Sequence, residues 1–289
     1  MDWYLLLGQA TVNGLVIGLL YLLMAVGFTL VFGVMRMVNF AHGEFYMLGA
    51  FCAYYLTVKL GLPFLLAVAA SFFIVGIGGC LIEAVVLKPF RKDELNGMIV
   101  TIGLALILQN LALITFGPDP VAMPAIAEGS SRLLGVNVAN SRLYVVGSAV
   151  LVLLLLYGFL KHSRGGRGLR AVVEDPQTAS IQGVRARLYY PLGFGIGVGL
   201  AAIGGALMAP LFSVSPFMGH APLLKAFMVV ILGGLGSIPG AAVAGLLLGL
   251  LESYSSLFLS SSTADMMLFV LVVVGMLAFP RGVIGRGEA

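Results

Sequence analysis

The stretch from Trp3 to Met35, WYLLLGQATVNGLVIGLLYLLMAVGFTLVFGVM, contains no Asp, Glu, Lys or Arg. A helix of about 20 apolar residues is long enough to cross the hydrocarbon of a bilayer. The stretch therefore predicts a membrane-spanning helix near the start of the chain. It has no basic leader and is longer than the apolar core of a signal peptide, about 7–15 residues, so we expect it to stay in the membrane.

The remainder of the 289-residue chain has the same character, with 60% hydrophobic and 10% charged residues overall. Soluble domains are about 45–50% apolar and about 25% charged, so this composition excludes a soluble enzyme, a nucleic-acid binder and a disordered protein. We expect an all-α polytopic bundle in the lipid bilayer, forming one transmembrane domain over 1–289. It would have about 8–9 membrane segments, one or two of them broken or re-entrant. The expected spans are 8–34, 44–59, 63–87, 96–116, 142–160, 188–212, two pieces between Pro216 and Ser260 of which the first is 222–235, and a last one from about Ser262.

Basic residues gather at a few places: Arg36, residues 88–92, residues 161–187 and residues 281–286. Because positive loops stay on the cytoplasmic side, the loop 161–187 is expected in the cytoplasm and the nearly neutral loop 117–141 outside. The N-terminus is then outside. We expect 222–235 to cross the membrane and the C-terminus to be cytoplasmic, as Arg281 and Arg286 require. A re-entrant 222–235 would place the C-terminus outside.

Glycine makes up 39 residues, about twice its usual share of 7%. Many glycines are four residues apart, a spacing that lets helix backbones approach closely in lipid. The pairs are Gly14 and Gly18, Gly193 and Gly197, Gly195 and Gly199, Gly236 and Gly240, and Gly245 and Gly249.

Two segments interrupt the apolar runs and predict broken helices. Irregular backbone at membrane depth survives only where protein or a water-filled cavity satisfies it, and such breaks in both halves of a chain are typical of a transport pathway. The polar residues there either line the pathway or cap a helix. The candidates are Asn39, His42, Gly43 and Glu44 in the first break, and Gly233, Gly234, Gly236 and Pro239 in the second.

Other polar residues lie inside or beside the spans. Gln109 and Asn110 either line the pathway or bond across helices. Glu83 is expected to pair with Lys88 or Arg91. We expect His220 and Lys225 to reach the lipid head groups or a binding protein. Glu252 is expected to be solvated. The loop 117–141 is expected to be either a contact for a binding protein or a plain surface loop.

The cytoplasmic loop holds the run SRGGRGLRAVVEDPQTASIQGV, from Ser163 to Val184. We expect a helix over 167–174, then Asp175 as the N-cap of a second helix with Pro176 at its first position, ended by Gly183. The loop either meets anionic lipid or docks a short amphipathic helix into a groove of a partner protein.

No motif indicates catalysis. The chain lacks a Gly-x-x-x-x-Gly-Lys-[Ser/Thr] phosphate loop and a His-Glu-x-x-His zinc motif. Its two cysteines, Cys52 and Cys80, have no metal-ligand spacing. We expect neither an enzyme nor a bound cofactor or metal.

Three runs carry a resemblance to a known family. They are VNFAHGEFYMLGA from Val38 to Ala50, GGRGLRAVVEDPQTASIQGV from Gly165 to Val184, and VVILGGLGSIPGA from Val229 to Ala241. In this order they resemble the permeases of branched-chain (hydrophobic) amino acid ABC importers, over essentially the whole chain. The match is to the LivH-type rather than the LivM-type subunit.

The resemblance implies a permease of the bacterial inner membrane that moves branched-chain or other small neutral amino acids by alternating access. Its implied partners are a LivM-type permease in a heterodimer, two ATP-binding subunits and a periplasmic substrate-binding protein. Import of urea or short amides, and a secondary transporter driven by an ion gradient, stay open as alternatives. The residues implied to seat the ATP-binding subunit are Arg167, Leu169, Arg170, Val173, Glu174, Asp175, Pro176 and Gly183.

Overall fold

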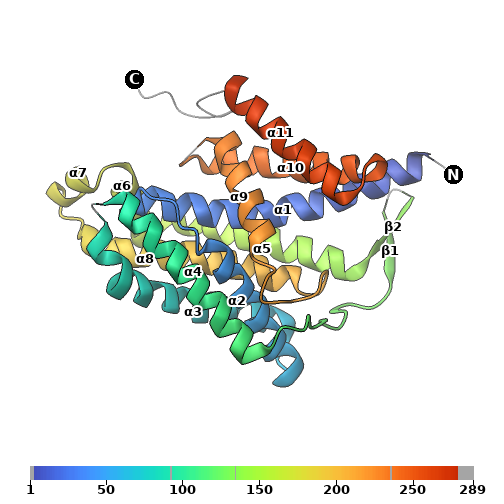
Figure 1. The fold of residues 1–289 in the computed structure, drawn as a ribbon, viewed down its shortest axis with the longest axis horizontal. Helices are drawn as coiled ribbons and strands as arrows, with labels where there is room; N and C mark the ends of the chain where they lie inside the picture. The colour runs from blue at the N-terminus through green and yellow to red at the C-terminus, as the bar shows by residue number, and fades with distance from the viewer. Residues whose placement is uncertain (1–2, 92, 134, 235, 279–289) are drawn as a thin grey trace.

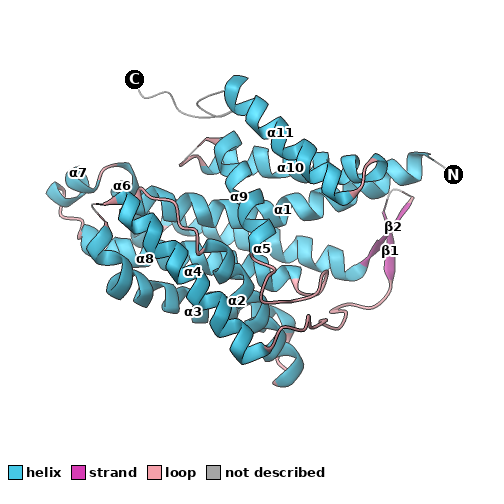
Figure 2. Cartoon of the chain, viewed as in Figure 1, coloured by secondary structure: helices cyan, strands magenta, loops and turns pink. Residues whose placement is uncertain are grey.

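The computed structural model describes residues 3–91, 93–133, 135–234 and 236–278, which form a bundle of helices with a small hairpin at one end (Figures 1 and 2). In chain order the α-helices are α1 (Trp3–Met35), α2 (His42–Tyr54), α3 (Phe64–Ile82), α4 (Glu94–Phe116), α5 (Asn140–His162), α6 (Arg164–Glu174), α7 (Pro176–Ile181), α8 (Ala186–Met208), α9 (His220–Gly233), α10 (Ile238–Phe258) and α11 (Ser261–Ala278). Shorter π and 3-10 turns extend α2 and α3: η1 (Tyr55–Lys59), η2 (Glu83–Leu87) and η3 (Lys88–Phe90).

Six of the described helical stretches are long and apolar enough to cross a bilayer. They are Trp3–Met35, Phe64–Phe90, Glu94–Phe116, Asn140–His162, Ala186–Met208 and Ile238–Phe258. The expected count of 8–9 membrane segments is therefore not confirmed, because the other three expected segments fall on the shorter helices α2, α9 and α11. Arg281 and Arg286, which placed the C-terminus, lie outside the described residues.

Two helices form the centre of the bundle, α1 and the glycine-rich α8, and both are mostly buried. The predicted close packing of small residues is confirmed where α1 crosses α10. A Cβ on Gly14 would lie 2.9 Å from the carbonyl oxygen of Gly249, and one on Gly18 would lie 3.0 Å from that of Gly245. Two small-xxx-small motifs thus face each other, and their backbones gain van der Waals contact that larger residues would prevent.

The expected all-α fold is confirmed apart from one short β-hairpin. Residues 130–133 (β1, Ser130–Leu133) and 136–139 (β2, Val136–Ala139) pair as an antiparallel hairpin within the loop 117–141. Val136 and Val138 are buried while Asn137 and Ala139 are exposed, the period of two that a half-buried strand requires. The hairpin lies at the end of the bundle opposite α6 and α7 (Figure 1).

Candidate functional site

The basic loop folds as the expected pair of short helices, which we call the elbow (residues 164–181). Ser163 begins it, accepting a hydrogen bond at Oγ from the Gly166 backbone N–H at 2.8 Å. Because Ser163 caps the helix, α6 starts at Arg164, three residues before the predicted start. Asp175 is extended between the helices and its carboxylate accepts from the Gln177 N–H at 2.8 Å. Gly183 follows α7 with a left-handed φ of +84°, which ends the helix as predicted.

The apolar face of α6 is covered by this chain's own helices. Leu169 and Val172 are fully buried. A Cβ on Gly193 of α8 would stand 2.9 Å from Leu169, and one on Gly33 of α1 would stand 2.9 Å from Val173. The surface that the elbow offers to other molecules is therefore its polar side together with α7. Its exposed members include Arg167, Arg170, Glu174, Asp175, Gln177 and Ile181.

The first broken segment, residues 36–41, runs back along α1. His42 opens α2, and its Nε2–H donates to the Met24 carbonyl at 3.2 Å. Met24 lies eleven residues before the end of α1 at Met35, which is about 16 Å at 1.5 Å per residue. The α2 helix therefore starts well inside the bundle rather than at the level where α1 ends.

This segment buries polar side chains that are only partly satisfied. Asn39, His42 and Glu44 are each at most 3% exposed. Asn39 Oδ1 accepts from the Ala41 N–H at 3.1 Å, a bond within the turn before α2. The N-cap position itself is Ala41, so Asn39 does not cap the helix. Asn39 Nδ2, His42 Nδ1 and Glu44 Oε2 have no protein partner within the described residues. Buried polar atoms are nearly always bonded, so these three atoms mark a place that water or a solute would complete.

Helix α9 touches both breaks. At its start, Gly219 lies against Gly43. At its end, a Cβ on Gly233 would stand 2.6 Å from the Gly240 carbonyl oxygen, so a tight turn joins α9 to α10. Left-handed backbone at Gly234 and Gly236 makes this turn, and α10 then begins with Pro239 in its first turn.

The two amides in α4 differ in their surroundings. Gln109 Nε2 donates to His220 Nε2 at 2.8 Å, which ties α4 to α9. Asn110 bonds only within its own helix, to the Leu106 carbonyl at 2.7 Å, and is exposed. Of these two candidates, only Gln109 lies between helices.

A buried ionic cluster joins four helices and was missed from the sequence. Lys225 of α9 is 7% exposed. Its Nζ lies 2.7 Å from Glu252 of α10 and 2.5 Å from Asp265 of α11. The Tyr21 hydroxyl of α1 donates to Glu252 at 2.9 Å. The expectations that Lys225 reaches the head groups and that Glu252 is solvated are therefore wrong. The sequence spaces these residues too far apart for any local pattern to reveal the cluster.

The expected partner of Glu83 is Arg91. The Arg91 guanidinium lies 2.5 Å from the fully buried Glu83 carboxylate and stacks over the Tyr190 ring, 4.3 Å from its centroid. This ion pair fastens the end of α3 to α8.

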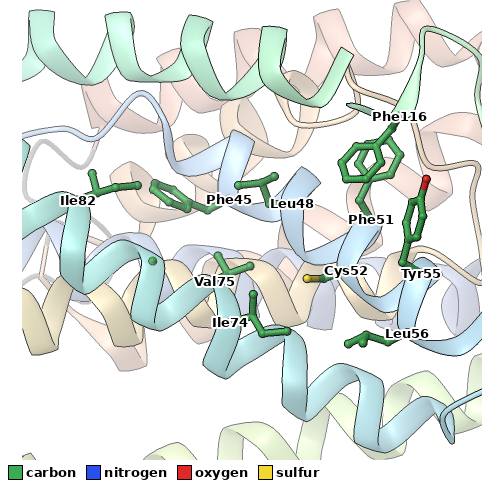
Figure 3. A pocket seen from close by; sticks show the side chains of 11 residues that line it. Phe45, Leu48, Phe51, Cys52, Tyr55, Leu56, Ile74, Val75, Ile82 and Phe116 are labelled. Atoms are coloured by element: carbon green, nitrogen blue, oxygen red, sulfur yellow. The ribbon is translucent and has the colours of Figure 1, made fainter. Parts of the chain in front are cut away.

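An apolar groove of about 290 Å³ lies between α2, α3 and the end of α4 (Figure 3). Phe45, Phe51, Ile74 and Phe116 are among its walls. None of the candidate polar residues lines it, and its only side chains with polar atoms are those of Cys52 and Tyr55. The groove therefore has no charged group to pair with a charged or zwitterionic solute.

Comparison with known proteins gives consistent matches over nearly the whole chain. Residues 10–277 match the sequence model of the permease component of branched-chain amino acid transport systems. The chain is 36% identical to the LivH permease protein of a high-affinity branched-chain amino acid transport system in Salmonella typhimurium, covering 97% of this chain and 96% of that protein. It is 35% identical, with the same coverage, to the corresponding BraD protein of Pseudomonas aeruginosa. A weaker match, 29% identical over 61% of this chain and 48% of the relative, is the fructose import permease FrcC of Rhizobium meliloti. No solved structure matches the chain.

Proposed function

This chain belongs to the family of permease components of branched-chain amino acid transport systems, and from that premise we propose that it carries branched-chain amino acids across the bacterial inner membrane. It is a transport permease and not a catalytic enzyme. The named relatives do not favour an ion-coupled secondary transporter or an importer of urea or amides.

The elbow is the observation that supports transport powered by partner ATPase subunits. Its polar side is exposed at one end of the bundle, while its apolar side is fixed against α1 and α8. An exposed helix pair that is held rigidly suits a docking element. A partner protein that moves the elbow would also move α1 and α8, on which it packs. We place this end in the cytoplasm, with the N-terminus and the β-hairpin outside, because the loop 161–187, which contains the elbow, carries the largest basic cluster.

The proposed assembly contains this chain, a LivM-type permease, two ATP-binding subunits and a periplasmic substrate-binding protein. ATP binding and hydrolysis in the partners would move the elbow, and the two permeases would alternate between outward and inward openings. The breaks around Asn39, His42 and Glu44, and around Gly233 and Gly240, would lie along the pathway. The unpartnered buried atoms of Asn39, His42 and Glu44 support that assignment for the first break.

The test is uptake by the reconstituted complex. The chain is co-expressed with its co-purifying subunits, placed in proteoliposomes with the binding protein, and supplied with radiolabelled leucine. We expect uptake that requires ATP inside the vesicle and stops when the partner ATPase is inactivated. Uptake driven by an ion gradient without ATP would contradict the proposal.

A further inference from the structure

Arg36 has a backbone conformation that is unusual for its residue type. Its φ is +56°, the one left-handed non-glycine residue in the described part of the chain. Side chains other than those of glycine, asparagine and aspartate are disfavoured there because Cβ crowds the carbonyl oxygen. Such a conformation persists where the surrounding structure holds it, and it often marks a functional position.

The contact that holds Arg36 in place is with the elbow. Arg36 Nη2 donates to the carbonyl oxygens of Val173 and Glu174, each at 3.1 Å. These are the last carbonyls of α6, which the helix itself leaves without partners. The C-terminus of a helix carries partial negative charge, so the guanidinium suits it both as a donor and as a cation.

Packing around this contact fixes the elbow on α1. Gly33, two residues before the end of α1, leaves room for Val173. The side chains of Val34 and Leu169 both lie over Gly193 of α8. The last turns of α1 and α6 therefore form one packed unit, with Arg36 bonded across its end.

On its other side Arg36 continues into the broken segment. Residues 37–41 lead from it to His42, which bonds the Met24 carbonyl inside the bundle. Asn39 and Glu44, with their buried unpartnered atoms, belong to the same segment and the helix start that follows it. Arg36 is thus the residue at which the elbow and the broken segment meet.

We propose that Arg36 is a positioning residue that carries the displacement of the elbow into the broken segment 36–41. The left-handed turn aims the guanidinium at α6 while the main chain reverses toward the bundle. A shift of α6 then pulls on the first residue of the segment and changes where Asn39, His42 and Glu44 lie. The inference rests on the proposed function, since it assigns the residue that links the ATPase to the pathway.

The experiment compares Arg36→Gly, Arg36→Lys and the control Lys88→Ala in the full reconstituted complex. Lys88 is an exposed basic residue of η3 and lies outside the elbow. Glycine accepts a positive φ, so Arg36→Gly removes the guanidinium without adding backbone strain. Three quantities are measured: bound ATPase subunits, ATP hydrolysis rate, and solute imported per ATP.

We expect Arg36→Gly to bind the ATPase subunits and hydrolyse ATP within about twofold of wild type, while solute imported per ATP falls at least about tenfold. Arg36→Lys keeps the positive charge but loses the planar, multi-donor guanidinium. Its solute imported per ATP should lie between that of wild type and that of Arg36→Gly. If Arg36→Gly does not fold into the membrane, the ratio of solute imported per ATP in Arg36→Lys decides. A wild-type ratio in the variant that folds, or loss of ATPase binding by folded Arg36→Gly, would overturn the inference. Failure of the proposed function would be distinct, because the wild-type complex itself would show no ATP-driven uptake.

Discussion

Gly43 and Gly219 lie backbone against backbone at the point where the starts of α2 and α9 meet. A Cβ on Gly43 would stand 2.4 Å from the Gly219 carbonyl oxygen, and a Cβ on Gly219 would stand 2.3 Å from that of Gly43. Real Cβ atoms do not approach backbone oxygens this closely. The two broken helices can touch here only because both residues are glycine.

Gly43→Ala is therefore expected to push α2 and α9 apart. Overpacking of this kind costs about 1–3 kcal/mol, and here backbone rather than a flexible side chain must shift. The check is the apparent melting temperature of the purified protein in detergent. The matched control is Gly103→Ala in α4, where nothing lies within 4 Å of the new Cβ. Equal melting temperatures for Gly43→Ala and wild type would contradict the close contact.

The cluster around Lys225 predicts a second stability effect. Lys225→Met leaves the Glu252 and Asp265 carboxylates near each other without their cation. Breaking one side of a buried pair costs about 3–5 kcal/mol, and the half-exposed Asp265 carboxylate lowers that cost. We expect a clear drop in melting temperature for Lys225→Met.

The double variant Lys225→Met with Glu252→Gln supplies the control for charge. It removes the more buried carboxylate along with the lysine, so most of the lost stability should return. If the double variant melts as low as the single one, packing of the lysine stem rather than its charge holds α9, α10 and α11 together.

Local rules predicted the elbow well. The Asp175–Pro176 start and the Gly183 stop depend only on neighbouring residues, and capping chemistry is visible in sequence. The start of α6 was misplaced because Gly165 and Gly166 suggest a loop. In the structure Gly166 packs so closely on the Phe159 carbonyl that a side chain would not fit, a reason that exists only once α5 and α6 are placed.

Contacts between residues far apart in the sequence could not be predicted. The apolar pattern of α6 was visible, but a pattern cannot tell whether a helix face is covered by its own chain or by a partner. The same holds for Lys225, whose partners Glu252 and Asp265 are 27 and 40 residues away. Its apolar neighbours along the chain gave no sign of them. Glycine spacing, by contrast, predicted close backbone packing at these pairs, because small residues four apart let helices approach in lipid. It did not show that α1 would cross α10.

A third prediction concerns the Asp175 cap. Asp175→Ala combined with Gly183→Val removes both the N-cap and the left-handed stop of α7. We expect the protein to remain in the membrane while ATP-driven uptake falls about tenfold or more, because the docking surface loses its shape. Asp175→Asn is the matched control, since asparagine caps helices about as well as aspartate. Normal uptake by the Ala and Val double variant would contradict a docking role for the elbow.

The Asp175 cap also predicts how binding of the ATPase subunits depends on pH. Hydrogen bonds from the Thr178 hydroxyl and the Gln177 N–H hold the pKa of the Asp175 carboxyl below its usual value of 3.8. A group whose pKa is lowered on folding adds stability above its unfolded pKa and loses it only as the pH falls through the folded value. ATPase binding to the elbow should therefore not change between about pH 5 and pH 8 through this residue. A pull-down of the ATPase subunits across that range, with Asp175→Asn in parallel, checks it. A pH step in wild type that Asp175→Asn abolishes would show that the carboxyl titrates there.

The last prediction separates the pathway role of Glu44 from a structural one. Glu44→Gln keeps the shape of a side chain that is 3% exposed and has an oxygen without a partner among the described residues. If Glu44 faces the solute or its water, uptake should fall at least about fivefold while the melting temperature stays near wild type. If the carboxylate only completes the start of α2, uptake per folded transporter should match wild type. Glu94→Gln, an exposed position in the first turn of α4, controls for loss of a carboxylate without burial. Because intramembrane ionisable residues usually face an interior pathway, we expect the first outcome, and uptake equal to that of Glu94→Gln would remove Glu44 from the pathway.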